Sequence, residues 1–68
     1  MLCSSIIFFS NNDIVCEIDD NKYHNLNESE LLIFVTTVAK EKGADHAILR
    51  AFHHNQHHGK DSMLWSAV

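Results

Sequence analysis

The sequence predicts a small α+β domain with the element order β-β-α-β-β. One helix over about residues 28–42 is expected to cover one face of a mostly antiparallel four-stranded sheet. Three observations lead to this fold class: an alternating apolar segment at 13–19, a well-capped helical segment, and further apolar segments at 47–52 and 63–68. The 68 residues allow one domain, 1–68, and we find neither a linker nor an internal repeat.

The first two strands are expected to form a β-hairpin over residues 3–19, with Asn11 and Asn12 at its turn. Asparagine tolerates positive φ better than other residues with a side chain, which suits a tight turn. The second strand alternates, so three of its apolar side chains should share one face: Ile14, Cys16 and Ile18. A two-residue turn pairs Ser10 with Asp13. That register puts Cys16 opposite Ile7 rather than Cys3, so we expect no disulfide.

The helix has signals at both ends. Asn27 is the expected N-cap and Glu30 stands three residues later, as in a capping box. Gly43 is the expected stop, because glycine adopts the left-handed conformation that ends helices. Six apolar residues fill one arc of this helix, and Ile33 falls outside it among polar residues: Leu31, Leu32, Phe34, Val35, Val38 and Ala39.

The segment 44–54 supports two interpretations. Its apolar core of six residues follows a glycine and precedes a polar cluster, which is typical of a strand rather than a helix. A last strand over 63–68 would then complete the sheet. The alternative is a β-hairpin followed by two helices.

Composition limits the classes of function. The formal net charge is −4, and the five basic residues are scattered, so we expect no nucleic-acid binding through phosphate contacts. The apolar runs are far shorter than the roughly 20 residues of a membrane span. The first residues lack the basic region of a secretory signal, so the expected compartment is the cytoplasm.

A histidine cluster is the most conspicuous local pattern: His53, His54, His57 and His58. Imidazole is a common ligand of zinc and of other divalent transition metals, so these residues provide the alternative hypothesis of a metal-binding module. The spacing matches no established zinc motif, and we prefer the interpretation of a solvated polar loop that is rich in histidine. We therefore expect no cofactor. Protonation of all six histidines would reverse the sign of the net charge, which could change association between neutral and mildly acidic pH.

Catalytic motifs are not found in the sequence, so we expect no enzymatic activity, with catalysis at a dimer interface as the remaining route. Three segments carry apolar residues on both faces, whereas one helix can cover one face. The sequence therefore predicts a small interaction or accessory protein that acts as a homodimer or by docking on a larger partner. The expected contact residues are Phe9, Ile33 and Trp65, which have no evident role in the core.

Overall fold

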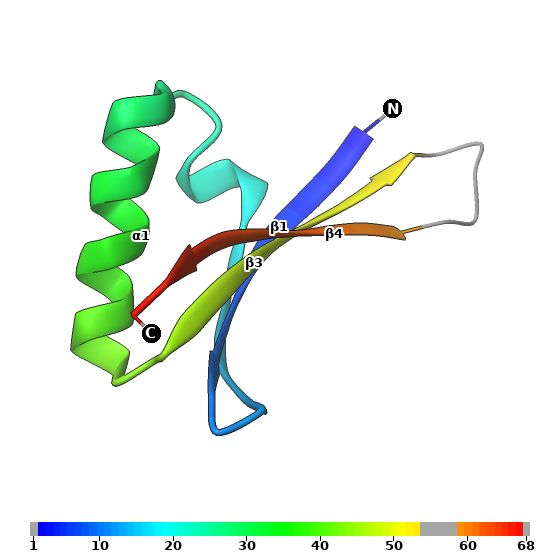
Figure 1. Ribbon diagram of the computed structural model, residues 1–68. Coiled ribbons are helices and arrows are strands. Elements are labelled where there is room, and N and C mark those ends of the chain that lie inside the picture. Colours follow the sequence, from blue (N-terminus) through cyan, green and yellow to red (C-terminus); the bar gives the residue numbers. More distant parts are fainter. Residues whose placement is uncertain (1, 54–58, 68) are drawn as a thin grey trace.

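The computed structural model describes residues 2–53 and 59–67 (Figure 1). In this part of the chain one α-helix packs on a four-stranded antiparallel sheet with the strand order β2-β1-β3-β4. The elements are β1 (Leu2–Ser10), β2 (Asp13–Asp19), a short 3-10 helix η1 (Asp20–Lys22), α1 (Glu28–Lys42), β3 (His46–His53) and β4 (Gly59–Ser66). The predicted order β-β-α-β-β is confirmed, and the ambiguous segment 44–54 contains a strand instead of a second helix.

The turn between β1 and β2 has the expected chemistry. Asn11 and Asn12 both have positive φ, 53° and 70°, as the two central residues of a type I′ hairpin turn require. Ser10 pairs with Asp13 directly beside the turn, as predicted. The twist of such a turn matches the twist of the two strands that it joins.

The predicted register holds for this pair and then shifts. Phe9 pairs with Ile14 and Phe8 pairs with Cys16, so Val15 is an extra residue in β2. The prediction that Cys16 lies opposite Ile7 is therefore wrong, because a β-bulge moves the rest of β2 by one residue. Cys16 is a free thiol, half-buried against the core.

The bulge also separates two isoleucines that simple alternation put on one face. Ile18 packs against the core, whereas Ile14 lies opposite Phe9 and its side chain is 62% exposed. Alternation of side chains across a strand holds only while the pairing is regular. Ile14 therefore belongs to the face of the sheet that turns away from α1.

Helix α1 begins and ends as predicted. The Asn27 side chain accepts a hydrogen bond from the Glu30 N–H at 2.8 Å, and the Glu30 carboxylate accepts one from the Asn27 N–H at 3.2 Å. This reciprocal pair satisfies two amide groups that the helix itself leaves without partners. At the other end Gly43 adopts the left-handed conformation, with φ 72°, which suits glycine because it has no Cβ.

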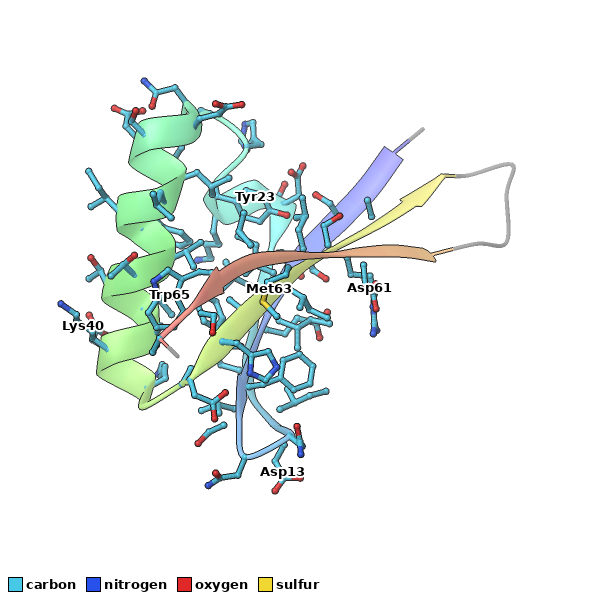
Figure 2. The ribbon with its side chains drawn as sticks, in the orientation of Figure 1. Asp13, Tyr23, Lys40, Asp61, Met63 and Trp65 are labelled. Atoms are coloured by element: carbon cyan, nitrogen blue, oxygen red, sulfur yellow. The ribbon has the colours of Figure 1, made fainter. Side chains whose placement is uncertain are left out.

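The core lies between α1 and one face of the sheet. Figure 2 shows Tyr23 on this side, between α1 and the strands. Burial of the apolar side chains in this core provides most of the favourable free energy of folding. The fully or nearly fully buried members are Ile6, Phe8, Tyr23, Val35, Ala39 and Ala47.

Strand β4 also departs from the expected alternation. It spans Gly59–Ser66 instead of 63–68, and its pairing with β3 shifts between Met63 and Trp65. Because of this shift Leu64 and Trp65 both pack against the core cluster, although alternation put them on opposite faces. Met63, on the other hand, is 64% exposed.

Candidate functional site: the open face of the sheet

The face of the sheet opposite α1 is the candidate functional surface, and we call it the open face. No element of the described residues packs over it, whereas α1 covers the other face (Figure 1). Strand pairing assigns its members, because residues directly opposite in antiparallel strands share a face. These are Ser5, Ile7, Phe9, Ile14, Glu17, Asp19, His46, Ile48, Arg50, Asp61 and Met63.

The middle of the open face is apolar. Ile7 of β1 pairs with Ile48 of β3, and Ile48 pairs in turn with Met63 of β4. Ile7 is only 1% exposed, since its neighbours on the same face surround it, whereas Ile48 and Phe9 are half-buried. Figure 2 shows Met63 on the side of β4 that faces away from α1. The centre is thus a well-packed apolar floor with a methionine exposed at its edge.

An aromatic stack borders this floor. The Phe9 and His46 rings lie nearly parallel, with centroids 4.9 Å apart and an angle of 7° between their planes. Nδ1 of His46 lies 2.5 Å from Oδ1 of Asp45, and the backbone N–H of Asn11 donates to Oδ2 of Asp45 at 2.9 Å. The hydrogen bond from Asn11, followed by the one with His46, lowers the pKa of Asp45. The hydrogen bond with Asp45 and the stacking on Phe9 together fix the orientation of the His46 ring.

Charged groups lie toward the two edges of the open face. Glu17 and Asp19 are exposed on the outer strand β2, opposite Ile7 and Ser5. Asp61, on the outer strand β4, accepts hydrogen bonds from Nε of Arg50 at 3.1 Å and from its Nη2 at 3.3 Å. This two-bond contact with Asp61 raises the pKa of Arg50.

The open face therefore carries an excess of negative charge. Among its described members the carboxylates are Glu17, Asp19 and Asp61, and the permanently charged base is Arg50, which one of them already neutralises. Protein–protein interfaces often combine an apolar centre with a polar rim in the same way. In the described part of the chain no group of three or more His, Cys, Asp or Glu residues is arranged to hold a metal ion.

The structure places the three predicted contact residues on three different surfaces. Phe9 is half-buried on the open face, and Ile33 is 66% exposed on α1. Trp65 is half-buried against the core cluster, on the side of the sheet that faces α1 (Figure 2). One flat partner could not contact all three at once, so Phe9 is the member that coincides with the candidate site.

The histidine cluster cannot be placed. The side chain of His53 and the residues His54, His57 and His58 lie outside the described part of the structure. The proposed metal-binding module therefore stays a hypothesis from the sequence.

A second apolar surface lies between α1 and β4. It is an open groove of about 380 Å³, lined by Glu28, Leu31, Leu32 and Leu64. Leu32 was expected in the buried arc of the helix, but its side chain is 51% exposed at this groove. The groove contains one charged side chain, Glu28, at the start of α1. The open face carries more apolar and more charged side chains, so we treat it as the candidate site.

Sequence reasoning missed the residues that form most of the open face. Ile48 and Met63 can be assigned to it only once the pairing of β3 with β1 and β4 is known, and Ile14 only once the bulge is known. A further missed residue is Asp45, whose side chain and backbone contact three separate segments. An aspartate two residues after a helix-ending glycine is a signal for such a connection, although a weak one.

Comparisons with known proteins give no match: no family model, curated protein or solved structure is significantly similar to this chain. No helix among the described residues is long and apolar enough to cross a membrane.

Proposed function

We propose that this protein is a small interaction module that docks its open face on the surface of another protein chain. The observation that carries the proposal is an apolar sheet face without a covering layer in the described residues. Its accessible apolar members are Phe9, Ile14, Ile48 and Met63. Contiguous apolar patches with polar edges are typical of protein–protein interfaces. The partner is a second copy of the chain or a different protein.

The outer edges of the sheet favour a partner that docks on the open face over a partner that adds a further strand to the sheet. Both outer strands, β2 and β4, contain a register shift, at Val15 and at Leu64 respectively. Bulges in outer strands hinder a further strand from pairing there. The open face, by contrast, presents its side chains for packing.

Two matched variants test the proposal. Met63→Glu places a charge on the open face, and Leu32→Glu places the same charge on α1, at a side chain of similar exposure, 51% against 64%. The native chain and both variants are immobilised and exposed to an extract of the source cells, and the captured proteins are compared. Sedimentation velocity of the three chains measures self-association in parallel.

We expect Met63→Glu to abolish a specific capture or self-association that Leu32→Glu preserves. The cause is the free energy of burying an unpaired carboxylate in an apolar contact. Identical capture by all three chains, together with a monomeric native chain, would contradict the proposal. Thermal unfolding of each variant verifies that it is folded before capture is compared.

A further inference from the structure

We infer that the partner of the open face is an amphipathic helix of another protein, with basic residues beside its apolar stripe on the flank that faces β2. This inference rests on the proposed function and names the chemistry of the partner. It follows from the width of the face and from the positions of its charges.

The width of the open face suits one helix. Neighbouring strands lie about 4.8 Å apart, so the outer strands of a four-stranded sheet are separated by roughly 14 Å. A helix with its side chains is about 10–12 Å wide. A helix lying along β1 and β3 would contact Phe9, Ile48 and Met63 with its apolar stripe and would reach the outer strands with its flanks.

The charges select a basic helix. Glu17 and Asp19 lie on β2 at one side of the apolar centre, and Asp61 lies on β4 at the other. Arg50, on β3, is already engaged by Asp61. Because Arg50 and Asp61 neutralise each other, the excess of negative charge lies on β2, at Glu17 and Asp19. Lysine or arginine residues on the flank of a docked helix that faces β2 would therefore meet these two carboxylates, which is electrostatic complementarity across the interface.

The same positions disfavour a second copy of the chain. A twofold axis parallel to the strands lays β2 of one copy over β4 of the other, so Glu17 and Asp19 approach the second copy's Asp61, whose charge its own Arg50 already neutralises. A twofold axis across the strands lays β2 over β2, and the same acids face each other. The second arrangement brings carboxylates together, which opposes association, and the first offers Glu17 and Asp19 only a cation that is already engaged by Asp61.

Synthetic peptides provide the test. The first is a helical peptide of the length of α1, 15 residues, with a leucine and alanine stripe flanked by lysines. The second has glutamate at every lysine position, and the third is a scrambled version of the first without a stripe. Fluorescence anisotropy of the labelled peptides measures their affinity for the full native chain.

We expect the lysine peptide to bind and the glutamate and scrambled peptides to bind far more weakly, with an affinity that falls as salt is added. Glu17→Lys should weaken binding of the lysine peptide by about fivefold, since one exposed attraction is replaced by a repulsion. Glu41→Lys, an exposed position on α1, changes the net charge equally and should leave the affinity nearly unchanged. Glu17→Gln, with a smaller expected effect, serves if Glu17→Lys does not fold.

Three results would overturn the inference. They are equal binding of the lysine and glutamate peptides, equal weakening by Glu17→Lys and Glu41→Lys, and no binding of any peptide. The proposed function would then survive if capture from the extract still depended on Met63. A stable dimer of the native chain at low ionic strength would identify a second copy as the occupant and would also overturn the basic helix.

Discussion

Tyr23 shows how a polar side chain is accommodated in this core. Its ring is buried next to α1, while its hydroxyl lies 2.8 Å from Oγ of Ser4, which in turn donates to Oδ1 of Asp20 at 3.2 Å. These contacts connect β1 to η1 and provide the hydroxyl with the partner that a buried tyrosine needs. Burial raises the pKa of Tyr23, the hydrogen bond with Ser4 partly offsets this, and the nearby Asp20 and Asp19 carboxylates raise the pKa further.

The titration of Tyr23 is directly measurable, because the chain contains one tyrosine. Ultraviolet absorbance of the tyrosinate should appear at higher pH in the folded chain than in the chain unfolded by denaturant. A pKa raised by folding contributes stability that is complete below the unfolded value of 10.0 and is lost as the pH rises through the folded value.

Substitution separates the causes of this shift. Asp20→Asn removes a neighbouring negative charge and should lower the pKa of Tyr23. Asp13→Asn, at the end of β2 that is distant from Tyr23, should not change this pKa. Equal titration in the folded and unfolded chains would show that the phenol is not buried as described.

At the scale of elements, the bulges decide which strand residues face the core. Val15 is the extra residue in β2, so the strand presents Ile18 and Cys16 to the core but Ile14 to the open face. Leu64 plays the same part in β4 and brings Trp65 against the core next to it. In both outer strands the β-bulge therefore determines which side chains face the core, and it also hinders a further strand from pairing at that edge.

Two matched substitutions test the bulge in β2. Ile14→Ala should change the free energy of unfolding by less than about 0.5 kcal/mol, because the side chain is exposed. Ile18→Ala removes a partly buried side chain from the core and should cost about 1–2 kcal/mol. Denaturant unfolding of both variants measures the difference, and equal costs would support regular alternation without a bulge.

The helix and the first turn could be predicted because their signals are local. Asn27, Glu30 and Gly43 act within a few residues, and so do Asn11 and Asn12. The strand at 46–53 could also be predicted, from its length and its flanks. These features need no knowledge of the rest of the fold.

The open face could be predicted only in outline. Its existence follows because several strands are apolar on both faces, whereas one helix can cover only one face of the sheet. Its members depend on pairing between β1 and β3, which are more than 35 residues apart. Ile14, Ile48 and Met63 were missed for that reason, and Trp65, which was expected to have no role in the core, packs against the core cluster. A bulge has no reliable sequence signal, and a shift of one residue reverses every later assignment.

The whole molecule is thin and acidic. The described residues form two layers with extents of 34 × 26 × 16 Å, and the full chain carries a net charge of −4. Figure 1 shows the distal ends of β3 and β4 projecting well beyond α1. An apolar face on such a molecule favours self-association, whereas its net charge and acidic edges oppose it.

This balance predicts a distinctive salt dependence. We expect the native chain to sediment as a monomer at low ionic strength and to associate increasingly as salt is added. The reason is that the screening length falls from about 30 Å at 0.01 M to about 3 Å at 1 M. Met63→Glu should suppress this association at high salt. A native dimer that dissociates on addition of salt would mean that opposite charges hold the copies together.

Asp45 has a consequence for how the molecule opens. Its backbone N–H donates to the Phe9 carbonyl at 2.8 Å, its carbonyl accepts from the Ala67 N–H at 2.9 Å, and its side chain holds Asn11. The hairpin turn, the entry to β3 and the exit from β4 are thus joined at one residue, at the end of the sheet nearest Gly43. Local opening should therefore begin at the opposite end, where β3 and β4 extend past α1, and exchange of backbone amides with solvent should slow progressively toward Asp45.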